Sequence, residues 1–185
     1  MFSRIHHSLV LFITSLVVMP LFLSASEISP EPRSKHAIEF SPFSPMFNIW
    51  AVQYTYHFAP RNELMLGVAY ANIKYPEGRS HAPGLIMGYR YFFGKGFHLE
   101  YQLWPAWNAY YEKNEQEYYK GLELWNEFRS GYVWDFQLGN HTFSLIPQML
   151  AGFGLLPGNK PDSFMKHVKK EGLFIAPVLF VGFKF

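Results

Sequence analysis

A histidine and a serine lie close together in the segment Asn140-His-Thr-Phe-Ser144. Such a pair can serve as base and nucleophile in acyl transfer when the two side chains meet. His141 and Ser144 are three residues apart, however, and an odd spacing in a strand directs two side chains to opposite faces. We therefore do not expect them to act together. His167 stands alone in a polar segment, with no second ligand or base at a useful spacing.

A second group of ionisable residues has the spacing of side chains that face one interior. Its six members are Arg90, His98, Glu100, Glu123, Glu127 and Arg129. Glu123 and Glu127 share one face of a predicted strand, but they lie about 13 Å apart by rise, so we do not expect them to form a paired acid and base without a third group. Mutual neutralisation is the simplest use of the six, because a buried acid without a partner is strongly unfavourable. An interior that moves protons or binds a small ligand is the alternative.

These residues must be positioned by strands, because the chain alternates with a period of two from about His36 onward. Strands are predicted at 36–44, 46–58, 63–75, 84–94, 97–111, 121–136, 142–154 and 172–185. Short turns are predicted at 59–62, 94–96 and 137–141, and longer polar loops at 76–83, 112–120 and 155–171. Pro42 and Pro45 make the first of these strands the least regular, since proline cannot donate within a ladder.

The alternation separates a polar face from an apolar one. In 97–111, His98 and Glu100 alternate with Leu99 and Tyr101. The polar face mixes lone charges with small and bulky residues, which suits the crowded interior of a small barrel. The predicted interior polar set is Glu39, Gln53, Thr55, His57, Arg90, His98, Glu100, Gln102, Glu123, Glu127, Arg129, Gln148 and Lys184. Its four acids and three bases are expected to pair, with Arg90 beside Glu100 and Arg129 beside Glu127.

The beginning of the chain is typical of an export signal. Residues 1–26 combine a short basic start, an apolar run over 9–23 and the small residues Ser24-Ala25-Ser26, so cleavage is predicted after Ser26. Residues 27–35 are predicted to be a flexible lead-in. No later run of 18 or more apolar residues exists, which disfavours a helical membrane protein. The absence of cysteine excludes disulfides and a lipid-anchored cysteine.

The last strand ends on an aromatic residue, Phe185, and its alternate residues back to Leu173 are all apolar. This ending, with short turns alternating with longer loops, resembles the bacterial outer-membrane β-barrels. The resemblance implies an all-β fold over 36–185: an antiparallel, up-and-down transmembrane β-barrel of about eight strands. It also implies that Phe185 faces lipid, that Lys184 faces the interior, and that the closing strand is recognised by the barrel-assembly machinery. A secreted sandwich or a lipocalin-like barrel is the alternative.

The expected function is a structural, interaction or small-ligand-binding role in the cell outer membrane, without catalysis, cofactor or metal. The alternative is a membrane-embedded enzyme acting on lipid A or phospholipid. The eight-stranded lipid A deacylases carry His and Ser two residues apart, which His141 and Ser144 do not match, and Asn126 and Ser130 are the only polar residues on the apolar face of 121–136. A channel is disfavoured because eight strands enclose little space. A formal net charge of +2 does not indicate a nucleic-acid partner, and a monomer bounded by lipid is expected. The basic end of 155–171 is a possible contact for anionic lipid headgroups or sugars.

Overall fold

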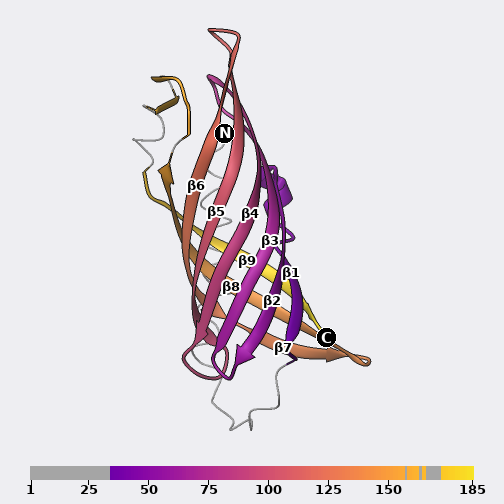
Figure 1. Ribbon diagram of the computed structural model, residues 1–185. Helices are drawn as coiled ribbons and strands as arrows, with labels where there is room; N and C mark the ends of the chain where they lie inside the picture. The colour runs from indigo at the N-terminus through magenta and orange to yellow at the C-terminus, as the bar shows by residue number, and fades with distance from the viewer. Residues whose placement is uncertain (1–33, 157, 163, 166–171) are drawn as a thin grey trace.

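The protein, described by a computed structural model, is one antiparallel sheet with almost no helix (Figure 1). The structure describes residues 34–156, 158–162, 164–165 and 172–185, so the predicted signal (1–26) and nearly all of the lead-in (27–35) lie outside the described residues. The nine strands are β1 (His36–Phe40), β2 (Ile49–Ala59), β3 (Asn62–Lys74), β4 (Gly78–Phe92), β5 (Phe97–Glu112), β6 (Glu117–Tyr132), β7 (Trp134–Leu138), β8 (His141–Leu156) and β9 (Phe174–Lys184). No helix in the described part of the chain has the length and apolar character needed to cross a membrane.

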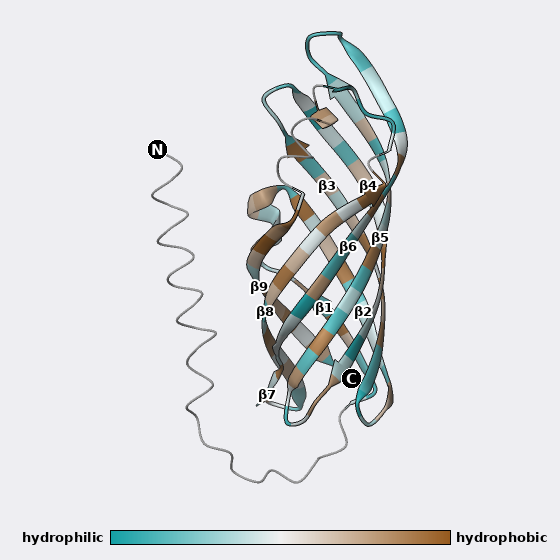
Figure 2. Ribbon diagram, turned by 90° about the vertical axis from the view of Figure 1, so that its left-hand side faces the viewer, coloured by the Kyte–Doolittle hydropathy of each residue, from teal (hydrophilic) through white to brown (hydrophobic). Residues whose placement is uncertain are grey.

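Most strands pair with their sequence neighbours, and two further pairings join distant parts of the chain. β6 pairs with β8, and β9 pairs with β1. The strands are long, tilted and wound about a common interior, as Figures 1 and 2 show from two sides. This arrangement is consistent with a barrel-like fold. Phe185 N donates to His36 O at 2.9 Å, which brings the end of the chain beside the start of β1.

The predicted strand 121–136 corresponds to β6 and β7, which are two pieces of one line of pairing. Gly131 pairs with Gln148 and Trp134 pairs with Leu145, so the register with β8 continues unchanged across Val133. The interruption falls beside the start of β5, since Val133 N donates to Gly96 O in the turn before β5. Beyond Val133, β7 pairs with β8 along one edge, and no described strand pairs with its other edge.

Two of the predicted long loops are wrong. The predicted loops were 76–83 and 112–120, but the connections after β3 and β5 are only residues 75–77 and 113–116. The β3–β4 and β5–β6 hairpins remain paired through most of the predicted loop residues. Lys74 pairs with Arg79, and Glu112 pairs with Glu117. The prediction was wrong because these hairpin tips are rich in polar residues, as loops are. We call the end of the sheet with connections 75–77, 113–116 and 157–173 the loop end, and the opposite end, with 60–61, 93–96 and 139–140, the turn end.

The first predicted strand is also shorter than expected. β1 stops at Phe40 instead of residue 44, and a 3-10 helix, η2 (Ser44–Phe47), precedes β2, which begins at Ile49 instead of residue 46. Pro42 cannot extend the ladder, and Pro45 occupies the first turn of η2, where its missing N–H is no loss. Asn48 ends η2 in the left-handed conformation, with φ 57°.

The predicted division into two faces is confirmed. Along β5, His98, Glu100 and Gln102 are buried, whereas Leu99 and Tyr101, which alternate with them, are exposed. Figure 2 shows hydrophilic and hydrophobic bands following one another along the strands. The buried face carries most of the polar and charged side chains, together with single apolar residues such as Ile86 and a small apolar cluster of Phe92, Val133, Ile146 and Phe180. We call these the inner face and the outer face. Lys184 is buried, as predicted, and Phe185 is 55% exposed.

Candidate functional site

The centre of the inner face is a line of alternating charges across four strands. Glu63 on β3 pairs in register with Arg90 on β4, Arg90 with Glu100 on β5, and Glu100 with Arg129 on β6. Arg90 donates from Nε to Glu100 Oε2 at 2.7 Å and from Nη1 to Glu63 Oε2 at 2.9 Å. Direct cross-strand neighbours lie close enough for such contacts without further folding of the chain.

Arg90 also reaches a strand that is not its neighbour. Its Nη1 and Nη2 atoms donate to the two oxygens of Glu39, on β1, at 2.9 and 2.8 Å. This two-point contact matches the planar guanidinium to a carboxylate, the strongest geometry for such a pair. Arg90 is 1% exposed, so it joins β1, β3 and β5 through three carboxylates at a site shielded from bulk solvent.

The second guanidinium, Arg129, extends the network toward β8. Arg129 Nη1 donates to Glu100 Oε1 at 3.1 Å, and its Nε donates to Glu127 Oε2 at 2.9 Å. Its central carbon lies 4.8 Å from the centre of the Phe180 ring, so the face of the cation is covered by an aromatic side chain. The predicted pairs of Arg90 with Glu100 and Arg129 with Glu127 are both present.

Three buried amides connect the charges to one another. Gln53 Nε2 donates to Glu39 Oε2 at 2.8 Å, and Gln102 Nε2 donates to Gln53 Oε1 at 2.9 Å and to Glu100 Oε1 at 2.7 Å. Gln148 Nε2 lies 3.0 Å from Glu100 Oε2. We call the set Glu39, Gln53, Glu63, Arg90, His98, Glu100, Gln102, Glu127, Arg129 and Gln148 the central network. Buried polar networks of this kind fix one arrangement when their members are satisfied.

His98 completes the network in one tautomer. Its Nδ1 atom is 3.2 Å from Gly96 O and its Nε2 atom is 2.8 Å from Gln148 Nε2. A carbonyl oxygen requires a donor and an amide nitrogen requires an acceptor, so Nδ1 carries the proton and Nε2 accepts. In this arrangement His98 is neutral and positions Gln148 against Glu100. His98 therefore supports the arrangement of the charges and is not itself one of them.

The charge balance of the centre differs from the prediction of four acids and three bases. Four carboxylates, from Glu39, Glu63, Glu100 and Glu127, contact two guanidiniums. Glu63 was absent from the predicted interior set, although it has the same parity as Met65 on the inner face. Lys184 instead pairs with Asp135 at 2.7 Å, and Ser144 donates to the same carboxylate. The imidazole of His57 lies 3.4 Å from Glu63 and is a further group beside these carboxylates.

Glu123, predicted to belong to the same set, lies in a separate group toward the loop end. Lys160 Nζ pairs with Glu123 Oε1 at 2.5 Å, and Asn108 Nδ2 donates to Glu123 Oε2 at 2.8 Å. The Lys160 side chain is 1% exposed although it belongs to the connection after β8. Burial lowers the pKa of Lys160, while its contact with Glu123 opposes that change.

The connection after β8 therefore packs against the inner face at the loop end. Phe164 is 5% exposed, and its ring centre lies 4.6 Å from that of Tyr110 and 4.9 Å from that of Tyr75. Gly121 on β6 permits the approach, because a Cβ there would stand 2.5 Å from the backbone nitrogen of Asn159. The lysines at 166, 169 and 170, and His167, lie outside the described residues.

The remaining candidate groups do not converge. Ser144 is buried and His141 is exposed against the ring of Phe183, which places them on opposite faces as their spacing predicted. Asn126 accepts from Tyr101 Oη at 2.6 Å and is 1% exposed, beneath aromatic side chains of the outer face. Within the described residues, no three His, Asp or Glu side chains are arranged to hold a metal ion.

Comparison with protein-family models, with curated proteins and with solved structures finds no match for this chain.

Proposed function

We propose that this chain is an eight-stranded, up-and-down β-barrel of the outer membrane of a Gram-negative bacterium, exported by a cleaved signal over residues 1–26. In this proposal the β6–β8 and β9–β1 pairings close the sheet, and β7 continues β6. The role is structural, interacting or ligand-binding, carried by the outer face and the loop end, and no catalysis is assigned.

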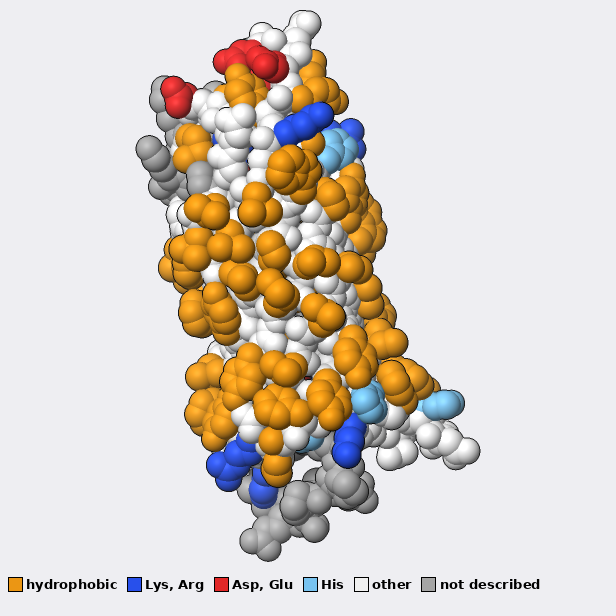
Figure 3. Space-filling view, in the orientation of Figure 1, with side chains coloured by type: hydrophobic (Ala, Val, Ile, Leu, Met, Phe, Trp, Pro, Cys, Tyr) orange, Lys and Arg blue, Asp and Glu red, His pale blue; other side chains and the backbone are white. Residues whose placement is uncertain are grey.

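One observation carries the proposal: the polarity of the sheet is the reverse of that of a soluble protein. Arg90 and Glu100 are 1% and 3% exposed, whereas Leu66 and Ile175 are 60% and 62% exposed. Figure 3 displays hydrophobic side chains across the middle of the face in view, with Lys and Arg toward both ends. A contiguous apolar surface of this extent is unfavourable in water and favourable in lipid.

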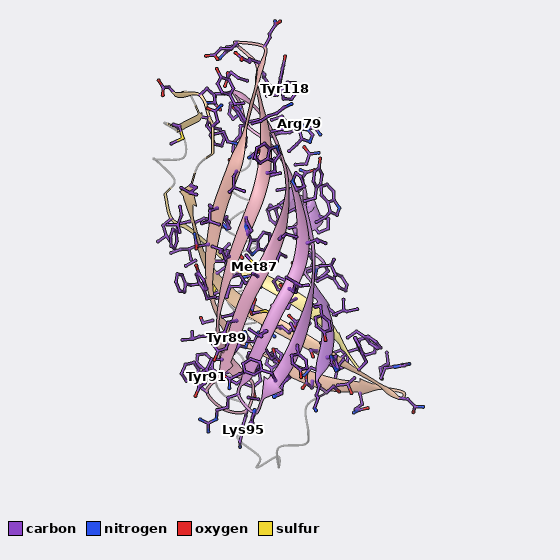
Figure 4. The ribbon with its side chains drawn as sticks, in the orientation of Figure 1. Arg79, Met87, Tyr89, Tyr91, Lys95 and Tyr118 are labelled. Carbon is purple, nitrogen blue, oxygen red and sulfur yellow. The ribbon has the colours of Figure 1, made fainter. Side chains whose placement is uncertain are left out.

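The order of residues along the outer face of β4 also supports a membrane location. Arg79 lies toward the loop end, Met87 in the middle, Tyr89 and Tyr91 further along, and Lys95 at the turn that follows (Figure 4). Cations at both ends, apolar side chains between them and tyrosines near the turn end match a bilayer with its two interfaces. We assign the loop end to the outside and the turn end to the periplasm, because the longest connection, 157–173, lies at the loop end and Phe185 lies at the turn end.

The interior determines what the barrel does not do. An eight-stranded barrel has room inside for little more than its own side chains, and here the central network occupies it. We therefore assign no pore function. The partners in this proposal are outer-membrane lipid along the outer face and the barrel-assembly machinery, which recognises the strand ending at Phe185. The protein acts as a monomer.

The test is the behaviour of the full-length protein expressed in a Gram-negative host. We expect it in the outer-membrane fraction, with an unboiled sample migrating differently from a boiled one on a denaturing gel. In planar bilayers the folded protein should give no steady conductance. Recovery of the processed protein as a soluble periplasmic species, with the same mobility before and after boiling, would contradict the proposal.

A further inference from the structure

A groove opens on the outer face where β1 ends. Phe40 is the last residue of β1 to pair, with Val52 on one side and Val181 on the other. Beyond it, Ile49–Ala51 of β2 pair only with β3, and Phe174–Phe180 of β9 pair only with β8. Segment 41–48, which contains η2, fills this interval without strand pairing.

The groove between this segment and the β2–β3 hairpin has a volume of about 470 Å³. Its lining is almost wholly apolar, and it includes Phe40, Trp50, Val52, Val68 and Tyr70. Two serines of segment 41–48 also line it, and one donates its hydroxyl hydrogen to the carbonyl of the other at 3.0 Å. We call this the lateral groove. Its chemistry suits a hydrocarbon chain and offers nothing to a charged ligand.

On the loop-end side of the groove, the outer face carries polar and cationic side chains instead of apolar ones. After Val68 and Tyr70, the next outer-face residues of β3 are Asn72 and Lys74. The residues opposite Asn72 and Lys74 in β4 are His81 and Arg79. Figure 4 places Arg79 near the loop end of the outer face, and Figure 3 displays blue side chains in the same part of the molecule above the hydrophobic middle.

Three hydrogen bonds connect these polar and cationic residues to the groove. Tyr70, which lines the groove, has its Oη atom 2.8 Å from His81 Nδ1. Arg79 Nε donates to Asn72 Oδ1 at 2.7 Å, and Asn72 N donates to Asn48 O, at the end of η2, at 2.9 Å. Among the described residues neither Lys74 nor Arg79 has an ion-pair partner.

We infer that the lateral groove and the Lys74–Arg79 pair form a binding site for one phosphorylated glycolipid of the outer leaflet, of the lipid A type. Its phosphate lies between the two cations, and one acyl chain lies in the groove. Lys74 and Val68 are six residues apart, about 20 Å along the strand, which is the span from a headgroup phosphate into the acyl region. Asn72 and His81 offer polar contacts to the sugar.

This inference rests on the proposed membrane location and deepens it, because it names the lipid and the place. Two features favour a glycolipid over a phospholipid. The site lies at the loop end, which the proposal assigns to the outer leaflet, and it presents two cations together with amide and imidazole groups suited to sugar hydroxyls. A single cation above an apolar surface would instead be typical of general contact with any anionic lipid.

The test is native mass spectrometry of the full-length protein purified from outer membranes in detergent. The protein is titrated with lipid A, with lipid A from which the phosphates have been removed, and with phosphatidylglycerol. We expect saturable one-to-one binding of lipid A and several-fold weaker binding of the other two. Arg79→Gln should weaken lipid A binding about fivefold, the effect of one basic residue at a charged lipid surface. Arg61→Gln, at the turn end, is the matched control and should change nothing.

The groove itself is tested by Val68→Trp, which fills it, against Leu66→Trp, two residues away on the same outer face. We expect Val68→Trp to weaken lipid A binding about tenfold, the cost of excluding roughly two methylenes, and Leu66→Trp to have no effect. Each variant is first shown to be folded, by a difference in gel mobility between unboiled and boiled samples. Equal binding of all three lipids, or equal behaviour of each variant and its control in folded protein, would overturn the inference and leave the barrel proposal intact. A protein that never enters the membrane would overturn both.

Discussion

Replacing Arg90 by methionine removes the cation on which three strands converge. Arg90 makes four hydrogen bonds to Glu39, Glu63 and Glu100 while only 1% exposed. Methionine fills similar space, so the change removes charge and donors without leaving a large cavity. The stability of the folded state should fall because the carboxylates remain buried after their partner has gone.

The loss is not shared equally among the three carboxylates. Glu100 keeps Arg129 at 3.1 Å, and Glu63 keeps His57 at 3.4 Å. Glu39 keeps the amide of Gln53, but no second cation among the described residues pairs with it. Removing one partner of a buried ion pair costs about 3–5 kcal/mol, and most of that cost should fall on Glu39 here. Glu39→Gln in the Arg90→Met background should therefore recover about 2 kcal/mol.

The assay is equilibrium urea unfolding of the protein in lipid vesicles, followed by the mobility of unboiled samples. With a slope of about 2 kcal/mol per M, Arg90→Met should lower the midpoint by about 2 M. Arg61→Met, in the exposed turn at 60–61, should remain within about 0.5 kcal/mol of wild type. A midpoint for Arg90→Met equal to that of Arg61→Met would refute the reasoning, as would a double variant no more stable than Arg90→Met.

Three further predictions concern other parts of the chain. Burial lowers the pKa of Lys160 below its usual 10.5, so in the pH window just below 10.5 the unfolded chain binds more protons than the folded one. The urea midpoint of unfolding should therefore rise with pH through that window, and Lys160→Met should abolish the rise. Gly121→Ala, whose Cβ would lie 2.5 Å from a backbone nitrogen of the 158–162 segment, should expose the bond after Phe164 to chymotrypsin, whereas Gly94→Ala, with nothing within 4 Å, should not. Deleting Phe185 should reduce the fraction of protein assembled in the outer membrane, whereas Phe185→Trp should preserve it; equal assembly of the two variants would contradict a role for the terminal aromatic residue.

The sequence predicts the two faces well because parity in a strand is a local property. Arg90 and Glu100 have the parity of the inner face and lie on either side of a short turn, so their contact follows from the hairpin alone. Glu63 carries the same signal, since it shares the parity of Met65 and stands opposite Arg90 once the preceding turn is set. It stands at the very start of a predicted strand, where the assignment of a residue to a face is least secure.

Other features depend on distance in space and could not be predicted locally. Arg90 meets Glu39 only because β1 and β4 face one interior, and the Lys160–Glu123 contact depends on how the connection after β8 folds back. The tips of the β3–β4 and β5–β6 hairpins were predicted as loops because polar residues occupy both of their faces. The cause of the shortened β1 was visible in Pro42, but the groove that results from it required the neighbouring strands.

The central claim is that the outer face of this sheet lies in a bilayer, and spin labels along β4 test it most directly. The chain has no cysteine, so single cysteines can be introduced at the outer-face positions Arg79, Leu85, Met87, Tyr91 and Lys95 without background. In reconstituted membranes we predict that contact with dissolved oxygen is highest at 85 and 87, and that contact with a water-soluble nickel chelate is high only at 79 and 95. Uniform accessibility to the nickel chelate along all five positions would contradict the account.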